Sequence, residues 1–563
     1  MRQTLAYLIF LFTAISIHAQ SITGRVTDEN DIPLAYANVI LQKADHTYIE
    51  GTVTDTTGRF VISAHQEAAM IQISFIGYET AYRQLDEVSK IKLNPDTEVL
   101  GKSIVKATLP KTEIKGDAFV TKIENSVLSE AGSASDVLIK LPGVTYKDEA
   151  YEVFGKGTPQ IYINGRQVRD NAELEQLNSN EIQNVEVVQN PGARYDADVR
   201  AVIRIQTIRK QGDGFSFDLR STTYQGDNTD LIETVNLNYR YKGLDIFGSV
   251  NYTRNDWYQK ADIIETLQGT QLLKAVQKSE FTGLSNTLSS TIGLNWQLNE
   301  NHSVGVRYRP DHLISGKSGN HVLSDVTLDG ITDDISETKA EGYTEPKTDH
   351  QLNIYYNGNV GKLNIDLNAD LLDGRYSEIK RFDEDSEIQA DRVINTSNYI
   401  TNRLYASKLI LSYPIGQGNI SAGTEYTYTY RTDDYLNPEG YVPSSNTTIQ
   451  EDDINVFMDF RYPFSFGSVS AGLRYEHMVF NYLQDNELQL DRSRTYDNVY
   501  PNISFDAYAG DFQFMLSYAI KTQKPTYHQL RNSVVYMNRY SVDVGNPFLI
   551  PESIFLLLYS TIT

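Results

Sequence analysis

The chain has 563 residues, no cysteine and a formal net charge of −23 at pH 7. This length exceeds what one hydrophobic core supports and predicts two to four domains. The missing cysteines exclude a disulfide framework, a thiol nucleophile and a paired-cysteine metal site. Nucleic acid is an unfavourable partner, because phosphate binding needs a basic surface. The acidity is better explained by solubility and solvated loops.

Residues 1–19 have the features of a secretory signal peptide. Arg2 supplies the positive start, residues 5–15 are apolar, and Ala19 is a small residue suited to a cleavage site. A membrane anchor helix is the alternative, but the apolar stretch is short for a span of about 20 residues. No later segment has about 18 consecutive apolar residues, so residence in a membrane would require a closed β-barrel.

Residues 20–95 contain short strands separated by turn residues, which predicts a small β-sandwich. Asp55 and Gly58 are typical of such turns. A calcium site at the aspartates is the alternative, but acidic turn residues more often bond their own backbone. The predicted strands are residues 24–27, 37–42, 51–54, 60–63 and 71–75.

The runs GRVTDENDIPLAYANVIL (residues 24–41) and GTVTDTTGRFVI (residues 51–62) give a specific resemblance. They resemble the carboxypeptidase-regulatory-like domain that precedes many outer-membrane receptors of Bacteroidetes. The resemblance covers residues 21–93 and implies a transthyretin-like sandwich without catalysis of its own.

Residues 96–116 form a polar linker with little pattern. In receptors energised by TonB, a short extended segment lies at this place and adds as a strand to the periplasmic domain of TonB, through main-chain bonds that tolerate varied side chains. Residues 98–107 (EVLGKSIVKA) are the candidate for this Ton box, and an ordinary linker is the alternative. The candidate TonB-binding residues are Glu98, Val99, Leu100, Ser103, Ile104 and Val105.

Residues 117–210 have a mixed α/β pattern. A short helix at residues 135–141 is stopped by Pro142 and Gly143, and a strand at residues 160–163 enters a turn. A second helix is predicted at residues 172–177, and two further strands at residues 185–188 and 202–205.

Three stretches of this region, LIKLPGV, IYINGR and EIQNVEVVQNPGARYDADVRAVIRI, resemble the plug domain of TonB-dependent receptors. The family pattern carries a glycine pair where this chain has Arg200 and Ala201, which leaves the local turn geometry open. The matching residues, to which the resemblance gives a structural and gating role, are Leu141, Pro142, Gly143, Asn164, Gly165, Pro191, Gly192, Ala193, Arg194, Tyr195 and Asp196.

Residues 211–563 alternate between apolar and polar side chains, as in residues 363–371, and this period of two indicates β-strands. A soluble sandwich would give the same alternation. Strands that reach the 9–11 residues needed to cross a membrane, and aromatic residues beside the short turns, favour an outer-membrane β-barrel. We expect long polar loops at residues 310–345 and 431–453. The aromatic residues are Tyr241, Trp296, Tyr308, Tyr413 and Tyr462.

The fold class is therefore mainly β: a leading sandwich, a small α/β plug and a transmembrane antiparallel barrel. We count about 14 barrel strands, whereas a plug of about 90 residues needs a lumen near 22 strands wide. Residues 545–547 also resemble a mid-barrel loop of the family, and Thr563 replaces the usual terminal aromatic residue. The sequence thus predicts a barrel that is incomplete at its C-terminal end.

The chain lacks the HExxH and GxSxG motifs and any cysteine–histidine cluster, so we expect no enzyme, no cofactor and no catalytic or metal-binding residue. Tyr426, Tyr428 and Tyr430 share one strand face. They suit either stacking on a ligand or an aromatic belt at the outer leaflet, and the belt is the simpler interpretation.

By resemblance, the expected function is import of an extracellular ligand through a plugged barrel in the outer membrane. The TonB complex of the inner membrane would be the energising partner, outer-membrane lipid would surround the barrel, and the N-terminal domain would lie in the periplasm. The alternative is a barrel for surface binding, adhesion or signalling, with the plug as a permanent seal. The alternation of apolar and polar residues does not identify the ligand, because ligand specificity depends on the shapes of the loops.

Overall fold

The structure is a computed structural model that describes residues 21–76, 78–95, 110–115, 118–147, 150–168, 171–208, 213–509 and 512–562. The predicted signal peptide and the candidate Ton box residues lie outside the described residues. Within these ranges, the model contains no helix with the length and apolar character that a membrane crossing requires.

Residues 21–95, here called the leading domain, form two small sheets packed face to face, which confirms the predicted sandwich. Alternate residues of β4 and β5 point into the shared core, where Phe60, Ile71 and Ile73 are almost fully buried. The turn aspartate Asp55 accepts bonds from the backbone N–H of Thr57 and Arg59 at 2.8 and 2.9 Å. One sheet is β4 (Arg59–Ser63), β1 (Ser21–Thr27) and β7 (Ile91–Lys92), and the other is β3 (Tyr48–Val53), β2 (Asn38–Gln42), β5 (Met70–Ser74) and β6 (Ala81–Gln84).

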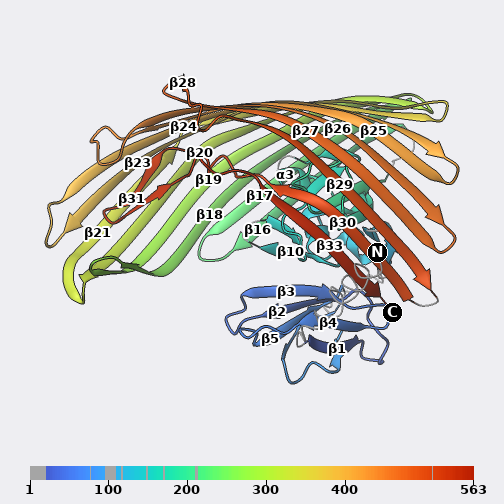
Figure 1. Cartoon of the computed structure of the whole chain (residues 1–563), viewed down its shortest axis with the longest axis horizontal. Helices are drawn as coiled ribbons and strands as arrows, with labels where there is room; N and C mark the ends of the chain where they lie inside the picture. The colour runs from blue at the N-terminus through green and yellow to red at the C-terminus, as the bar shows by residue number, and fades with distance from the viewer. Residues whose placement is uncertain are drawn as a thin grey trace, which may run out of the picture.

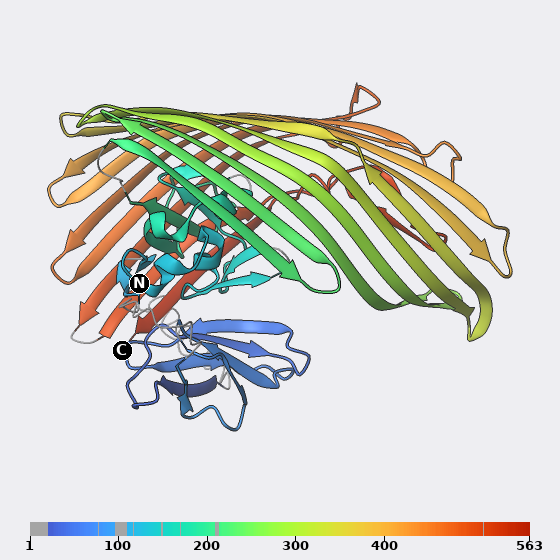
Figure 2. The ribbon, with the colours of Figure 1, turned by 180° about the vertical axis from the view of Figure 1, so that it is seen from behind.

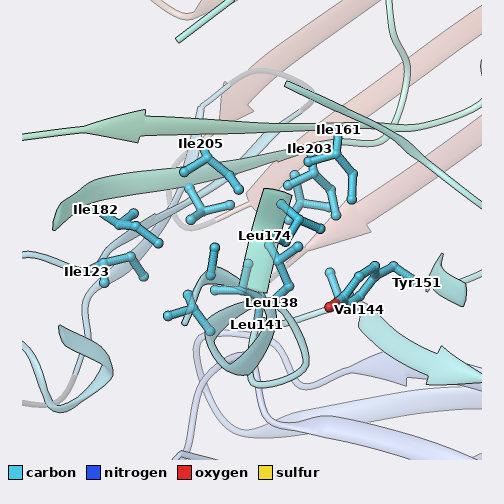
Figure 3. Close-up of a cluster of buried hydrophobic side chains, with 14 of the residues drawn as sticks. Ile123, Leu138, Leu141, Val144, Tyr151, Ile161, Leu174, Ile182, Ile203 and Ile205 are labelled. Carbon is cyan, nitrogen blue, oxygen red and sulfur yellow. The ribbon is translucent and has the colours of Figure 1, made fainter. Parts of the chain in front are cut away.

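Residues 112–207, here called the plug, fold around a core of their own. Side chains from the sheet and from both short helices meet in this core, as Figure 3 shows for Leu138, Leu174 and Ile203. The strands, in sheet order, are β13 (Arg166–Gln167), β12 (Gln160–Ile163), β15 (Val202–Thr207), β14 (Ile182–Val188), β9 (Ala118–Lys122) and β8 (Thr112–Lys115). A separate hairpin is β10 (Val144–Lys147) with β11 (Ala150–Val153), and the α-helices are α2 (Ala134–Leu138) and α3 (Ala172–Gln176).

The first plug helix is shorter than predicted. It begins at a capping box, in which the Asp136 carboxylate accepts from Ser133 N–H at 2.8 Å, and it ends at Leu138 rather than at residue 141. Pro142 explains the early end, because the residue before a proline is disfavoured in the helical conformation. Strands β8 to β11, each of four or five residues, were not predicted.

The remaining residues form one large antiparallel sheet, here called the wall, with 14 strands on its continuous path from β16 to β33. Strands β21 and β22 both pair with β20 and β23, so they act as one long strand that is interrupted at Pro346, which has no N–H to donate. In the described residues, β16 and β33 are the two edges of the wall.

The wall strands are β16 (Gly214–Gln225), β17 (Thr229–Tyr241), β18 (Leu244–Gln268), β19 (Leu272–Asn299), β20 (His302–Leu328), β21 (Ile331–Thr344), β22 (Lys347–Val360), β23 (Leu363–Ser386), β24 (Arg392–Ile415), β25 (Gly418–Leu436), β26 (Ser445–Phe464), β27 (Gly467–Gln484), β29 (Arg494–Ala509), β30 (Phe512–Gln523) and β33 (Glu552–Ile562). A two-residue strand, β28 (Glu487–Leu488), pairs with the end of β27. Between β30 and β33, the chain forms a small hairpin of β31 (Val534–Asn538) and β32 (Ser541–Val544).

The predicted long loops at residues 310–345 and 431–453 are wrong. Residues 310–345 belong mostly to β20 and β21, and only residues 437–444 of the second range lie outside strands. In the part of the wall farthest from the short turns, these strands are rich in charged and small polar residues, which is why their sequence resembles that of a loop. Across the outer surface of this part runs a row of charge pairs: Lys260 with Glu280 at 3.1 Å, His321 with Glu337 at 2.7 Å, and Arg381 with Asp383 at 2.7 Å.

The wall curves around the plug, which lies on its concave side, and the leading domain lies below both (Figures 1 and 2). The plug is nearer the ends that are joined by short turns, since it contacts residues such as Arg307 and Asp459, each about five residues from such a turn. Aromatic residues near these turns, including Tyr241, Trp296 and Tyr413, are exposed on the outer face, as expected of an interfacial belt.

An arginine introduced on the outer face should destabilise the lipid-covered part of the wall more than the part that projects beyond it. We expect Leu367→Arg, about six residues above a short turn, to destabilise the wall by about 2–4 kcal/mol, because arginine is costly at the bilayer midplane. The control, Leu323→Arg, lies about 21 residues from the turn of its strand and should cost about 0–1 kcal/mol. The measurement is urea unfolding in lipid vesicles, and equal losses for the two variants would contradict this placement.

Candidate functional site

The candidate functional site is the contact between the plug and the wall, where the plug loop of residues 190–200 meets the wall strands β24–β27 and the end of β30. Asp459 of β26 accepts from the backbone N–H groups of Ala193 and Arg194, both at 2.8 Å. Gly192 permits this approach, because a Cβ there would lie 2.8 Å from the Asp459 carboxylate. One wall carboxylate therefore binds two adjacent plug amides.

A second contact of this loop joins Asp196 to a charge network on the wall. Arg474 of β27 pairs with Asp196, and also with Glu425 of β25 at 3.1 Å. Lys408 of β24 binds the same Glu425 at 3.0 Å. Burial would raise the pKa of Asp196, but Arg474, Lys408 and Lys524 outweigh it and lower the pKa to about 2. The pairing is therefore lost only as the pH falls from the unfolded value, about 4, towards 2.

The end of β30 contacts the same plug loop from another side. Lys521 donates to the Pro191 carbonyl at 3.3 Å, and the Thr522 N–H donates to the Ala197 carbonyl at 3.0 Å. The surrounding protein displaces part of the hydration of the Asp198 carboxyl and, together with the neighbouring Asp196 carboxylate, raises its pKa to about 6. Asp198 itself remains accessible to solvent, so the loop carries an ionisable group at its open surface.

The third contact centres on Glu173 of helix α3, and we call Glu173, Arg166, Arg307 and Arg309 the Glu173 cluster. The Glu173 carboxylate, 2% exposed, binds Arg166 of the plug at 2.5 Å and Arg307 of β20 at 2.7 Å. Arg309 of β20 is also 2% exposed and lies 3.6 Å from the other carboxylate oxygen. Burial would raise the pKa of Glu173, but the three guanidinium groups lower it. The cluster lines a small cavity together with Gln351 and Asp370 of the wall.

Neighbouring bonds extend this third contact along the helix. Thr291 of β19 donates to the Gln176 side chain at 3.3 Å, and Asn236 of β17 donates to the Gln176 carbonyl at 3.3 Å. Arg220 of β16 donates to the Glu175 carbonyl. Helix α3 is thus bound to four wall strands, all through polar groups.

The predicted plug residues fall into two groups. Pro191 to Asp196 lie at the wall contact just described, and the Tyr195 ring packs edge-on against Tyr162 of the plug sheet, 5.5 Å between centroids. Leu141 is fully buried in the plug core, and Gly143 has a φ of 76°. Asn164 and Gly165, with φ of 50° and 85°, form the turn after β12, where Asn164 binds Thr207. These last four residues shape the plug rather than its contact with the wall.

The structure answers two further questions that the sequence raised, about the missing glycine pair and about three tyrosines of β25. Arg200 and Ala201 do not have positive φ, so the glycine pair of the family pattern is not needed here, and Arg200 instead donates to Gln523 at 2.6 Å. Tyr426 is 40% exposed on the face opposite Glu425, whose carboxylate points to the plug side. Tyr426 and its strand-mates Tyr428 and Tyr430 therefore lie on the outer face, where the belt interpretation puts them.

Sequence reasoning missed Glu173, Arg307, Arg309, Asp459 and Arg474. Polar residues recur at every second position of a wall strand, so nothing local distinguishes those that contact the plug. The contacts also join residues that are 134 to 278 positions apart. The one available signal was the regular polar alternation itself, which places Arg307 and Arg309 on the same face of β20.

Comparison with known proteins agrees with this architecture. Residues 21–98 match the carboxypeptidase regulatory-like domain, and residues 357–555 match the outer membrane protein beta-barrel family. The comparison with curated proteins finds no match. The chain therefore carries a carboxypeptidase regulatory-like domain near its start, and residues 357–555 of its wall match the outer membrane protein beta-barrel family.

The chain is also similar to solved structures of low sequence identity. The copper transporter OprC is 11% identical with a TM-score of 0.50, over 82% of this chain and 71% of OprC. The hemophore receptor HasR of Serratia marcescens, in complex with its hemophore HasA and heme, is 13% identical with a TM-score of 0.44, over 80% of this chain and 69% of HasR. The ferric enterobactin receptor PfeA of Pseudomonas aeruginosa is 8% identical with a TM-score of 0.23, over 80% of this chain and 100% of PfeA. The predicted resemblance is confirmed: the chain has the architecture of a TonB-dependent outer-membrane receptor.

Removal of the Glu173 charge should loosen the plug. Glu173→Gln removes the buried counter-charge of Arg307, whereas Arg309 keeps its pair with Asp311 at 3.0 Å, and breaking a buried ion pair typically costs about 3–5 kcal/mol. We expect faster hydrogen exchange at residues 171–182 with an intact wall. Glu175→Gln, in the same helix but outside the cluster, is the control. Unchanged exchange in the Glu173 variant would show that the cluster does not hold the plug.

A side chain at Gly472 of β27 should release the loop of residues 190–200. A Cβ there would lie 2.4 Å from the Asp459 carboxylate and 2.9 Å from the Ala193 Cβ. Hydrogen bonds to a charged group contribute about 1.5–3 kcal/mol, so Gly472→Leu should speed amide exchange at Ala193 and Arg194 by about 10- to 100-fold. Gly248→Leu is the control, because its Cβ would meet only the Thr291 carbonyl, at 3.6 Å.

Proposed function

We propose that this protein is a receptor that imports an extracellular ligand through its plugged barrel, with energy supplied by the TonB complex. The observation that carries the proposal is the polar character of the plug–wall contact. Charged and hydrogen-bonding groups can exchange their protein partners for water at modest net cost, whereas a shared apolar core cannot be opened cheaply. A polar seal suits a plug that must move.

The distribution of apolar side chains supports the same proposal. The hydrophobic cluster of the plug contains residues of the plug and of the leading domain, but none of the wall, among the residues that the structure describes. The second small plug cluster, around Val188 and Val202, is also confined to the plug. The plug therefore keeps its core when it separates from the wall and can move as a folded body.

The proposed direction of transport follows from the position of the leading domain. In this proposal the leading domain and the short turns face the periplasm, and the projecting strands face the cell exterior. TonB would engage residues 98–107, between the leading domain and β8, and pull the plug away from its wall contacts. The ligand would reach the plug from the projecting side of the wall.

Deletion of residues 98–107 tests the energy coupling. We expect the deletion to abolish uptake and to leave ligand binding intact, because the deletion removes no residue of the plug or of the wall. A sharper variant is Ile104→Pro, which removes an N–H that strand addition needs, with Ile104→Ser as the control that keeps it. The measurements are retention of the purified periplasmic domain of TonB, and cellular uptake of radiolabelled copper, heme and ferric siderophores with and without a protonophore.

Two results would count against the proposal. Equal uptake by the deletion strain would rule out residues 98–107 as the coupling segment. Uptake that persists in the presence of the protonophore, or no uptake of any ligand that the protein binds, would favour the alternative of a surface binding, adhesion or signalling barrel with a permanent seal.

A further inference from the structure

The leading domain contacts the plug through a surface that differs in kind from the plug–wall contact. Tyr36, Val53 and Ile76 of the leading domain pack against the hydrophobic core of the plug. The Tyr36 ring lies edge-on to Phe119 of β9, with 6.0 Å between centroids. The two domains thus share apolar surface, whereas the plug and the wall meet through polar groups.

A buried amide fixes the relative position of the two domains. The Asn38 side chain, 8% exposed, accepts from Gly143 N–H at 2.9 Å and donates to the Leu141 carbonyl at 3.4 Å. Both backbone groups belong to the turn that follows helix α2 of the plug. The two bonds fix how one domain sits on the other, because sliding of the docked surfaces would leave these buried polar groups unsatisfied.

The hairpin of β10 and β11 provides a third part of the contact between the leading domain and the plug. The Phe154 ring packs against Gly51 of β3, where a Cβ would come within 2.9 Å of the ring, and its centroid lies 6.4 Å from that of Tyr48. The Lys147 ammonium lies 5.9 Å from the centroid of the Tyr48 ring. Only glycine at position 51 allows the sheet of the leading domain to approach the hairpin this closely.

We infer that the leading domain and the plug move as one rigid body during transport, so that the leading domain is the handle through which the pull reaches the plug. This inference rests on the proposed function. Residues 96–111 join the leading domain to the plug along the chain, so a pull on this segment acts on both domains, and their shared apolar surface is costly to open. The load falls instead on the polar contacts with the wall, which is held by the membrane.

Engineered disulfides test this inference directly, because the native chain has no cysteine to interfere. The first pair is Gly51→Cys with Phe154→Cys, which joins the leading domain to the plug. The Gly51 Cβ position lies 2.9 Å from Phe154 Cγ, so the two Cβ atoms are at most about 4.4 Å apart, within the range of a disulfide. The second pair is Gly192→Cys with Asp459→Cys, which joins the plug to the wall.

We expect the two disulfides to have opposite effects in intact cells. The bond between the leading domain and the plug should form and leave TonB-dependent uptake within about twofold of the reduced state, whereas the bond between the plug and the wall should abolish uptake until dithiothreitol restores it. The uptake probes are the radiolabelled copper, heme and ferric siderophores already named. Loss of uptake on oxidation of the first pair would overturn the inference, because it would show that the two domains must separate.

Further results of the same experiment distinguish failure of this inference from failure of the proposed function. If uptake persists with the plug bonded to the wall, plug displacement is wrong, and the yield of the first disulfide still reports whether the domains are docked. Failure of that disulfide to form in an assembled protein would overturn the docking itself. If the Phe154 variant does not assemble, Tyr36→Cys with Phe119→Cys, bridged by a short bis-maleimide, tests the same surface with the same two outcomes.

Discussion

The structure depends on one constraint: in the hydrocarbon of a membrane every backbone N–H and C=O must find a partner within the protein. Strand pairing along the 14-strand path of the wall satisfies it between the edge strands β16 and β33, and the period of two then sends apolar side chains to the lipid and polar ones to the concave face. A plug placed on a polar surface cannot share a core with it. The constraint that places the wall in the membrane thereby also makes the plug separable from the wall.

Much of this fold could be predicted from local sequence, and the failures have a physical cause. Residues 363–371 alternate cleanly because one face meets lipid, so their strand and its faces were predictable. Residues 310–345 pair just as regularly, but their scattered apolar residues, such as Val322 and Leu323, fall on both faces, so the alternation that distinguishes a strand from a loop is weak. The prediction therefore detected the strand segments with one clean apolar face rather than the ends of the strands.

Only part of the candidate site could be predicted, because the local sequence shows a motif but not the distant residues that the motif contacts. The loop from Pro191 to Asp196 was found because its sequence resembles a known motif, and it does lie against the wall. Its partners Asp459 and Arg474, and Arg307 and Arg309 of the Glu173 cluster, could not be predicted, because each is one polar residue among many on an alternating wall strand. Only the folded chain shows which of those residues face the plug.

The sequence separation of these contacts has a consequence for the order of folding. The plug core closes within about 90 residues, whereas the bonds from Arg194 to Asp459, Asp196 to Arg474 and Pro191 to Lys521 span 265, 278 and 330 positions. Loop closure over such lengths is slow, and local contacts form first. The wall must therefore assemble around a plug that is already folded, and the contacts that seal the lumen are among the last to form.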